Sequence, residues 1–246
     1  MTHVRSLFEI TGQDAEHFLQ GLITNDIAGL ADGLVYAAIL TPQGKYLADF
    51  FLVQQGEAIL MDIATSIAPG LMARLGMYKL RADVTITPSG LHVHRGTDPT
   101  PIDGLVDPRN DALGWRAYRE SPQGSDSTDW DALRVTHCIP ETGIELLPDN
   151  YILEMGFEAL HGVDFRKGCY VGQEIVARMK HKTDLRKGLT TVTISGSAPV
   201  GTSILRNGRE VGALFTQSGG KAIAFLRFDR AGPDMTAGDI TVSWNA

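Results

Sequence analysis

Cysteine is scarce in this sequence. Its 246 residues include only two, Cys138 and Cys169, which lie 31 positions apart. Two thiols at that spacing match neither a zinc ribbon nor a C-x-x-C redox pair, and a structural disulfide is not expected in a reducing compartment. Two cysteines are also too few to hold an iron–sulfur cluster through four ligands of one chain.

Long hydrophobic runs and targeting signals are missing as well. No apolar run approaches the roughly 18 residues that a membrane helix needs. The opening MTHVRSLFEI has neither the apolar core of a signal peptide nor the acid-poor, Arg/Ser-rich composition of a transit peptide. We therefore expect a cytoplasmic protein that makes no membrane contact.

Metal-ligand spacings are equally rare. The seven histidines form no H-E-x-x-H motif, and His92-x-His94 alternates along an expected strand. The sequence therefore predicts no metal site.

An excess of positive charge is absent overall, since the formal net charge is -7. An acidic chain is a poor general ligand for nucleic acid, so direct nucleic-acid binding is not expected. One stretch departs from this balance, because residues 166–187 hold seven basic side chains against two acidic ones. Such a run forms either a solvated face or an anion site, and both remain open. The basic residues are Arg166, Lys167, Arg178, Lys180, Lys182, Arg186 and Lys187.

The composition is that of an ordinary globular protein, with 43% hydrophobic and 21% charged residues. The turn Pro42-Gln43-Gly44-Lys45 joins two expected strands, and Thr11 with Asp14 predicts a capping box for a helix. Strands, helices and antiparallel hairpins in alternation indicate an α+β fold. Expected strands cover 4–10, 34–41, 46–54, 57–64, 81–88, 91–95 and 115–120, and expected helices cover 14–23, 66–77 and 129–138.

The character of the sequence changes after Lys187. Short strands with frequent turns follow, and Asn207-Gly208 is a strong hairpin signal. These features predict a small antiparallel β-barrel. We therefore expect an α+β region over 1–183 and a barrel domain over 184–246. The first region would contain two intertwined α+β subdomains, with about 42–120 as the second.

The stretch from Lys167 to Arg178, K-G-C-Y-V-G-Q-E-I-V-A-R, is the candidate functional centre. Gly168 and Gly172 bracket Cys169. Glycine on both sides leaves the backbone free to adopt unusual dihedral angles and lets a ligand or partner approach closely.

A helix expected from Val171 would place Cys169 at or just before a helix N-terminus, where the helix dipole favours an anion. Arg166 and Lys167 add positive charge, and each of these factors lowers the pKa of a thiol. The thiolate is the reactive and metal-binding form. The alternative is a buried, inert thiol, as free cysteines commonly are, and the residues alone leave both open. We assign Cys138 to packing.

Several elements in the same order carry a family resemblance. The motif K-G-C-Y-V-G-Q-E followed by V-A-R resembles the signature of the YgfZ family, folate-binding proteins that assist iron–sulfur cluster assembly and repair. FEITGQDAEHFLQGLITND, LTPQGKYLADFFLV, LRVTHCIPETGIEL and LPDNYILEMGF resemble further elements of that family, so the likeness covers nearly the whole chain. It implies a fold similar to the folate-binding T-protein (aminomethyltransferase) of the glycine cleavage system. That fold has mixed and antiparallel sheets with helices and a C-terminal antiparallel β-barrel.

The resemblance also implies a cofactor, partners and site residues. The cofactor would be tetrahydrofolate or a derivative in a central cavity, and the partners would be the iron–sulfur assembly machinery or its client proteins. Cys169 would be the essential thiol, acting together with a second molecule. Asp49, Arg134 and Glu154 resemble residues that line the folate cavity. The other motif residues are Lys167, Gly168, Tyr170, Gly172, Gln173, Glu174 and Arg178.

Each of these polar side chains also has an ordinary structural role open to it. Asp49 would otherwise face solvent on an alternating strand, and Arg134 would form a helix-surface ion pair. Glu154 lies in the apolar stretch YILEMGF, where a carboxylate needs a partner, and this favours the cavity. Glu174 would either place a favourable charge at a helix start or hydrogen-bond the cysteine loop, which the motif favours. Arg178 would pair with Glu174 or contact a folate glutamate tail.

One departure from the T-protein bears on function. The T-protein carries G-G-x-L-D-D in its hairpin, whereas this chain reads Gly44-Lys45-Tyr46-Leu47-Ala48-Asp49 and keeps one carboxylate. A tetrahydrofolate-dependent aminomethyltransferase is therefore the alternative rather than the leading interpretation. A role in tRNA modification is a third hypothesis, which the basic stretch 166–187 permits. Whether the protein is an enzyme stays open.

Overall fold

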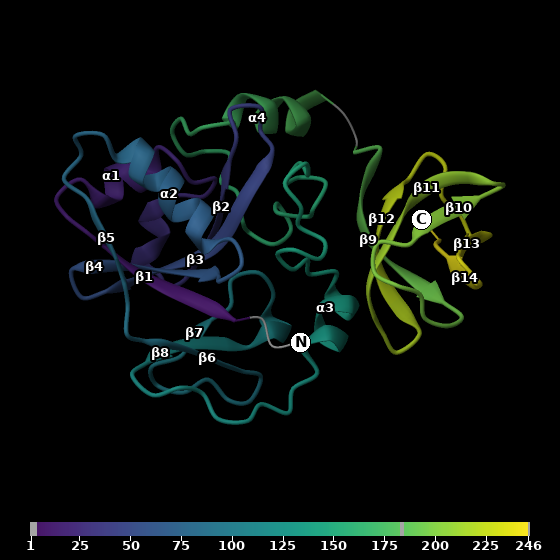
Figure 1. The fold of residues 1–246 in the computed structure, drawn as a ribbon, viewed down its shortest axis with the longest axis horizontal. Coiled ribbons are helices and arrows are strands. Elements are labelled where there is room, and N and C mark those ends of the chain that lie inside the picture. Colours follow the sequence, from purple (N-terminus) through teal and green to yellow (C-terminus); the bar gives the residue numbers. More distant parts are fainter. Residues whose placement is uncertain (1–3, 183–184, 246) are drawn as a thin grey trace. The chain divides into compact units, whose positions relative to one another are not determined.

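The computed structural model describes residues 4–182 and 185–245 (Figure 1). The chain divides into two compact units, each assembled from two separate stretches. Unit 1 comprises Met1–Thr128 and Glu158–Ile175, and unit 2 comprises Asp129–Phe157 and Val176–Ala246. The expected boundary between the two domains falls at residues 183 and 184, which lie outside the described residues. The division into domains 1–183 and 184–246 therefore stays a prediction.

A five-stranded antiparallel sheet forms the centre of unit 1, in the order β2-β3-β4-β1-β5. Strands β2 and β3 form the hairpin expected around residues 42–45, with Gly44 at φ +72°. A positive φ is adopted readily only by glycine, which explains the turn chemistry. The strands are β1 (Arg5–Thr11), β2 (Val35–Leu40), β3 (Tyr46–Gln55), β4 (Ala58–Ala64) and β5 (Thr85–Pro88).

One face of this sheet is apolar and covered by helices. Helices α1 (Ala15–Gln20) and α2 (Ala68–Lys79) pack their buried side chains against it. Leu19 and Leu75 from the helices are fully buried there together with Ile39 from β2. Every second residue of a strand points to the same face, so burial of this apolar set fixes the register of the sheet.

The opposite face of the same sheet carries polar and aromatic side chains. Cross-strand pairing places Tyr36 beside Phe51 and Phe51 beside Asp62. Asp49 lies two positions from Phe51 along β3 and therefore points the same way. All four side chains are buried. Because buried carboxylates need partners, this face must be supplied with hydrogen-bond donors.

A second sheet of unit 1 supplies some of them, in the order β6-β8-β7. Arg116 on β8 donates from Nη1 to Asp62 at 3.1 Å and so joins the two sheets. No strand was expected at β7, because its two residues are too few to show alternation. The strands are β6 (His92–Gly96), β7 (Leu105–Val106) and β8 (Trp115–Arg119). Short 3-10 helices, η1 (Ile27–Ala31) and η2 (Asp111–Leu113), complete the unit.

Unit 2 is built around a closed antiparallel barrel with the strand order β10-β11-β12-β9-β14-β13. Its interior is apolar, and Ile204, Leu214 and Val242 are fully buried there. Helix α3 (Trp130–His137) packs on the barrel, where Val135 contacts Phe215 in a buried cluster. The strands are β9 (Lys187–Ile194), β10 (Ser203–Arg206), β11 (Arg209–Ser218), β12 (Lys221–Arg227), β13 (Met235–Ala237) and β14 (Ile240–Ser243).

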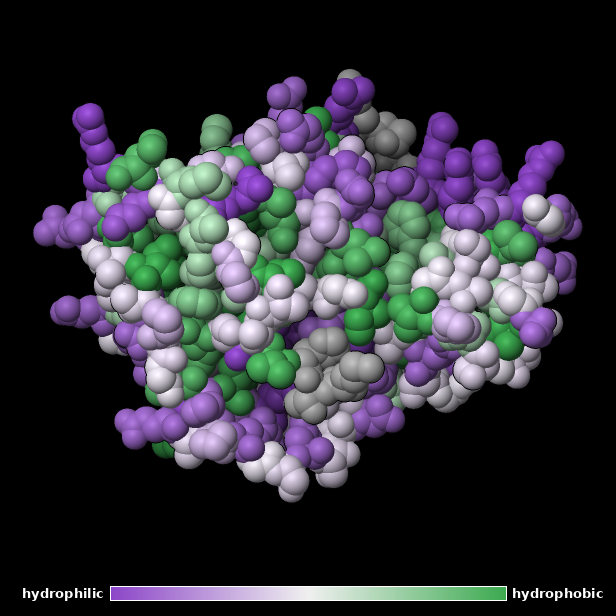
Figure 2. Space-filling view, viewed as in Figure 1, coloured by the Kyte–Doolittle hydropathy of each residue, from purple (hydrophilic) through white to green (hydrophobic). Residues whose placement is uncertain are grey.

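Helix α4 (Gln173–Lys182) begins two residues later than the sequence indicates. Gly172, directly before it, has φ +86°, so the helix cannot extend back to Val171. Figure 2 shows hydrophilic residues along the edge of the molecule where Figure 1 places α4. No helix within residues 4–182 and 185–245 is long and apolar enough to span a membrane.

The capping box expected at Thr11 and Asp14 is wrong. Thr11 ends β1, and Asp14 precedes α1 without a side-chain hydrogen bond to the helix. The Oδ2 atom of Asp14 instead accepts the backbone N–H of Asp83 at 2.8 Å. A hydrogen bond between distant parts of the chain has taken the place of the local one.

Candidate functional site

Cys169 carries an exposed free thiol in the irregular stretch before α4. Cys138 differs, because it is partly buried at the C-terminal end of α3. Burial raises the pKa of the Cys138 thiol to about 11, although a hydrogen bond with Thr191 opposes this. The thiol of Cys138 therefore stays protonated at neutral pH, and Cys169 is the accessible nucleophile or metal ligand.

Lys167 anchors the stretch that leads to Cys169. Its side chain is buried, and its Nζ donates to the carbonyl oxygens of Gln20 at 2.8 Å, Ile23 at 2.6 Å and Asn25 at 2.9 Å. Three carbonyls satisfy the three N–H donors of an ammonium group. The cysteine stretch is thereby tied to the loop that follows α1.

The charge of Lys167 is committed to this loop. Burial lowers the pKa of Lys167 to about 8, while Asp26 and Asp164 oppose the change. Its Nζ also lies 5.1 Å from the centre of the Tyr170 ring, a cation–π contact. Of the two cationic side chains expected to act on the thiol, Arg166 is the exposed one, at 94%.

The same loop also holds the chain just before the motif. Thr24 Oγ1 donates to the carbonyl oxygen of Gly162 at 2.7 Å, and Asn25 Nδ2 donates to that of His161 at 2.7 Å. The T-N-D element and the cysteine motif, which lie far apart in the sequence, are therefore one hydrogen-bonded structure.

The other end of the motif rests on the turn between β2 and β3. A Cβ atom on Gly172 would lie 2.6 Å from the carbonyl oxygen of Thr41, and one on Gly44 would lie 2.7 Å from Cβ of Ile175. The φ angles of the two glycines are +86° and +72°. Both space and backbone conformation therefore require glycine. The start of α4 lies directly on the hairpin whose second strand carries Asp49.

Gln173, not Glu174, makes the hydrogen bond to the cysteine loop. Its Nε2 donates to the carbonyl oxygen of Gly168 at 3.4 Å. Glu174 is exposed in the first turn of α4, where a negative charge is favourable. Within the described part of the chain, neither Glu174 nor Arg178 makes a side-chain hydrogen bond or ion pair. The expected contact of Glu174 with the loop and the expected Glu174–Arg178 pair are both missing there.

Asp49 is buried on the polar face of the sheet rather than facing solvent. Its Oδ2 accepts from the Tyr36 hydroxyl at 3.1 Å and its Oδ1 from the Tyr46 hydroxyl at 2.6 Å. Burial and the nearby charge of Asp49 raise the pKa of Tyr36 well above its ordinary value, so its hydroxyl stays a donor. A carboxylate accepts up to about four hydrogen bonds, which fits contact with N–H groups of a ligand.

An ionic cluster on this face was missed by the sequence analysis. Asp62 accepts from Arg5 Nε at 2.6 Å and from Arg116 Nη1 at 3.1 Å. Asp107 accepts from Arg109 Nη2 at 2.8 Å and from Arg116 Nε at 3.1 Å. Burial alone would raise the pKa of Asp107, but the two guanidinium groups hold it well below its ordinary value. The one available signal was Asp62, a carboxylate inside the apolar stretch AILMDIA.

The cluster reaches toward Asp49 through two aromatic rings. The guanidinium carbon of Arg116 lies 4.0 Å from the centre of the Phe51 ring, and that of Arg109 lies 5.4 Å from the centre of the Tyr36 ring. Cation–π contacts of this kind fix ring positions. The cluster therefore helps to orient Tyr36, one of the two donors to Asp49.

Arg134 is buried, and unit 2 uses most of its donors. Nε donates to the Ile139 carbonyl at 3.1 Å, and Nη1 donates to Asp131 at 3.0 Å. Nη2 donates to Glu145 at 2.6 Å and to Thr216 at 3.2 Å. Since a guanidinium has five N–H donors, at most one remains for a ligand.

Glu154 is also buried, with Oε2 3.3 Å from Nζ of Lys187. Asp49 belongs to unit 1, whereas Arg134 and Glu154 belong to unit 2. Each of these two carboxylates, taken by itself, is an acceptor of the kind that N–H donors of a ligand need. Arg134 has little to offer a ligand because its donors are used within the protein.

Comparison with protein families and curated proteins gives consistent relatives. The family described as "CAF17, C-terminal beta-barrel domain" matches residues 186–246. The iron–sulfur cluster assembly factor IBA57 homolog of Mycosarcoma maydis is 30% identical over 230 residues, which cover 79% of this chain and 57% of that protein. Mouse IBA57 is 30% identical over 270 residues, covering 91% and 75%, and human IBA57 is 29% identical over 271 residues, covering 90% and 75%. The chain thus spans little more than half the length of the fungal relative.

A solved structure shows the fold. The glycine cleavage system aminomethyltransferase T from Bartonella henselae superposes with a TM-score of 0.73, covering 97% of this chain and 81% of that chain at 13% identity. The expected α+β, T-protein-like fold with a C-terminal antiparallel barrel is confirmed.

The expected cytoplasmic location is wrong. The relatives from Mycosarcoma maydis, mouse and human are all named mitochondrial proteins. The expectation rested on the first ten residues, in which no targeting signal was recognised. Residues 1–3 of this segment lie outside the described part of the structure. A missing signal in one short segment carries less weight than the names of three relatives.

Proposed function

Because this chain belongs to the IBA57 family of iron–sulfur cluster assembly factors, we propose that it acts in the assembly or repair of iron–sulfur proteins through the thiol of Cys169. The observation that carries the proposal is an exposed free thiol on a stretch anchored by a buried cation. The family supplies the process, and the site supplies the reactive group.

The anchoring explains how the thiol would be presented. Lys167 fixes the chain before Cys169, and the close contact of Gly172 with the β2–β3 turn fixes it after. A side chain whose backbone is already fixed on both sides loses little conformational freedom when it binds a metal or a reaction partner. With two cysteines in the chain, an iron–sulfur cluster carried as cargo would take its other ligands from a second molecule.

Tetrahydrofolate is the second part of the proposal, and it is supported by the resemblance to the YgfZ family and by the T-protein-like fold. When bound, the folate would supply a carrier for one-carbon units. Asp49, oriented by Tyr36 and Tyr46, would accept N–H groups of the pterin. The assignment of Glu154, which belongs to unit 2, rests on the resemblance alone. The finer assignment, to the folate-binding YgfZ-type members of the family, belongs to the same proposal.

Complementation tests the role of the thiol. A strain lacking the gene would receive the wild type, Cys169→Ser or Cys138→Ser, and the activities of its iron–sulfur enzymes would be measured. We expect Cys169→Ser to fail and Cys138→Ser, which removes the other thiol, to restore activity. Full recovery with Cys169→Ser would contradict the proposal.

Calorimetric titration with tetrahydrofolate tests the folate site separately. We expect Asp49→Asn to weaken binding by about ten-fold, because a charge-assisted hydrogen bond is lost. Cys169→Ser should bind as the wild type does. A wild-type protein that binds no tetrahydrofolate would remove the folate from the proposal and leave the thiol untouched.

A tetrahydrofolate-dependent aminomethyltransferase is a second candidate, favoured by the TM-score of 0.73 to the Bartonella henselae enzyme and by the buried Asp49. The single carboxylate of the hairpin counts against it. Turnover of an aminomethyl donor with tetrahydrofolate, abolished by Asp49→Ala, would establish this activity instead. Unchanged tRNA modification in the deletion strain would remove the remaining hypothesis.

A further inference from the structure

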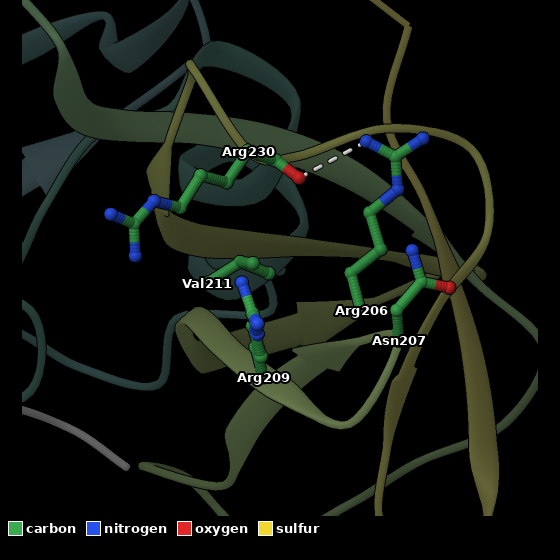
Figure 3. Close-up of a pocket in the computed structure, with 5 residues that line it drawn as sticks. All are labelled: Arg206, Asn207, Arg209, Val211 and Arg230. Atoms are coloured by element: carbon green, nitrogen blue, oxygen red, sulfur yellow. Dashed lines mark hydrogen bonds between the residues drawn. The ribbon is translucent and has the colours of Figure 1, made fainter.

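A hollow of about 520 Å³ lies in the barrel of unit 2 and is lined by none of the residues assigned above. Arg206 and Asn207 come from the end of β10 and its turn, Arg209 and Val211 from β11, and Arg230 from the loop after β12 (Figure 3). Three of its five lining residues are therefore arginines, and Val211 is the buried one.

The positive charge of this hollow is poorly compensated. Arg209 is exposed, and within the described residues it makes no side-chain hydrogen bond or ion pair. Arg230 Nε lies 3.7 Å from a carboxylate oxygen of Asp229, which also faces Arg227 at 3.5 Å. Of the three guanidinium groups that line the hollow, only that of Arg230 thus has an ion-pair partner within the described residues, and it shares this carboxylate with Arg227, in a chain whose net charge is -7. An anion bound here would relieve their mutual repulsion.

Arg206 is held in place by main-chain atoms. Its Nη1 donates to the carbonyl oxygens of Arg230 at 3.1 Å and Ala231 at 2.9 Å, the first of which is the dashed bond in Figure 3. A Cβ atom on Gly232 would lie 2.6 Å from its Cζ and Nη2 atoms, so the guanidinium group packs directly on this glycine. Its Nε and Nη2 donors are not used by these bonds. The edge of the guanidinium group that carries Nε and Nη2 can donate two parallel hydrogen bonds to two oxygens of one oxyanion.

We propose that this hollow binds the phosphate groups of a small oligophosphate-bearing molecule. Two phosphate groups carry about three to four negative charges, which matches three guanidinium groups, whereas one carboxylate would leave two of them uncompensated. The volume of about 520 Å³ falls in the ordinary range of small-ligand sites. The amide of Asn207 adds a further donor at the rim.

Calorimetric titration of the full chain with sodium tripolyphosphate tests the proposal, with ATP and citrate as further ligands. We expect one saturable site per chain for tripolyphosphate, weakened at higher salt, and at least ten-fold weaker binding of citrate. ATP that binds as tightly as tripolyphosphate identifies a nucleotide as the source, and binding of tripolyphosphate alone identifies a free oligophosphate. Citrate that binds as tightly as either, or no saturable binding, overturns the phosphate site.

Variants separate a built site from diffuse surface charge. Arg209→Gln removes one guanidinium group, and Gly232→Ala displaces that of Arg206 without changing the charge of the protein. We expect each to weaken tripolyphosphate binding by about ten-fold or more. Lys221→Gln removes an exposed positive charge elsewhere on the barrel and should leave affinity within about two-fold of the wild type.

Equal weakening in Arg209→Gln and Lys221→Gln would reduce the effect to net charge and overturn the proposal. An unchanged affinity of Gly232→Ala, beside a weakened Arg209→Gln, would overturn the role of Arg206. Thermal unfolding of each variant shows that the barrel remains folded, so a loss of binding cannot be mistaken for a loss of structure.

Discussion

The ammonium nitrogen of Lys167 lies 2.6 Å from the carbonyl oxygen of Ile23, although 144 positions separate the two residues. The carbonyls of Gln20, at the end of α1, and of Asn25 accept from the same nitrogen. Lys167 therefore anchors the cysteine motif to this part of the chain. The exposed thiol of Cys169, two positions later, is held in position by this buried contact.

Replacement of this cation should loosen both partners. Lys167→Met keeps an apolar stem of similar length but leaves one buried and two partly buried carbonyls without their donor, so we expect a loss of about 2–4 kcal/mol of unfolding free energy. Urea unfolding measures the loss, and hydrogen exchange should increase in residues 22–26 and 161–168. Lys221→Met, at an exposed position, is the matched control. Equal stability of the two variants would contradict the anchoring role.

The same lysine predicts a dependence on pH. Its pKa is about 8 in the folded protein against an ordinary lysine pKa of 10.5, so between these limits the folded state binds fewer protons than the unfolded state. Stability rises with pH wherever the unfolded state binds more protons. The stability advantage of the wild type over Lys167→Met should therefore grow from pH 8 to 10, by at most about 1.4 kcal/mol per pH unit. Parallel pH curves for the two proteins would refute this.

The two thiols should react at very different rates. Cys169 is exposed, whereas the pKa of Cys138 is raised to about 11, which leaves only about 0.1% of its thiol ionised at pH 8. Native protein treated with iodoacetamide at pH 8 should take up one label rapidly and the second only after denaturation. Cys169→Ser should abolish the rapid label, and Cys138→Ser should retain it. Two rapid labels in the native wild type would show that Cys138 is accessible.

Loss of a buried carboxylate in the ionic cluster should be costly. Asp107→Asn removes the carboxylate that faces Arg109 and leaves Arg116 with that of Asp62, and breaking a buried ion pair in this way costs about 3–5 kcal/mol. Because the pKa of Asp107 is lowered in the folded protein, its contribution is present above about pH 4 and is lost as pH falls. The difference between wild type and Asp107→Asn should accordingly shrink in acid.

Asp103 provides the control for this experiment. It also pairs with an arginine, Arg119, at 2.7 Å, but Asp103 is exposed and Arg119 is only partly buried. Asp103→Asn should therefore change stability little, since exposed ion pairs contribute little. Similar losses in Asp103→Asn and Asp107→Asn would show that burial is not the cause.

Close packing of the β2–β3 turn against α4 gives a prediction that a second glycine can control. Gly44→Ala introduces a Cβ atom 2.7 Å from Ile175, whereas Gly56, at a similar φ of +60°, has nothing within 4 Å of its added Cβ. Gly56→Ala therefore measures backbone strain alone, about 1–2 kcal/mol. Gly44→Ala should cost more and should increase hydrogen exchange at residues 172–176. Equal losses would mean that the contact with Ile175 is unimportant.

Local patterns were enough to predict the fold elements that depend on neighbouring residues. Alternation revealed β2 and β3, the turn at 42–45 was indicated by its proline and glycine, and Asn207-Gly208 marked a hairpin of the barrel. The family resemblance supplied the three-dimensional arrangement. Short strands such as β7 were not predicted, because two residues are too few to show an alternating pattern of apolar and polar side chains.

The chemistry of the site was less predictable, because partners come from distant parts of the chain. Nothing near Lys167 indicates that its charge is spent on Gln20, Ile23 and Asn25. Arg134 was assigned to a ligand, yet Glu145 and Thr216 occupy much of it, the latter 82 positions away. Sequence motifs indicated candidate residues, and only the fold shows what each one contacts.

The chain crosses between its two units after Thr128, Phe157 and Ile175, so neither unit is continuous. Synthesis on the ribosome therefore cannot finish one unit before starting the other. Unit 1 waits for residue 175, and the stretch 129–157 waits longer still, until the barrel strands that cover α3 have been made. Through that interval Val135 lacks its buried barrel partners Phe215 and Ile223, and a chain stopped within the barrel would leave it exposed to chaperones and to aggregation. The folding of the stretch 129–157 thus depends on barrel strands that are synthesised nearly a hundred positions later.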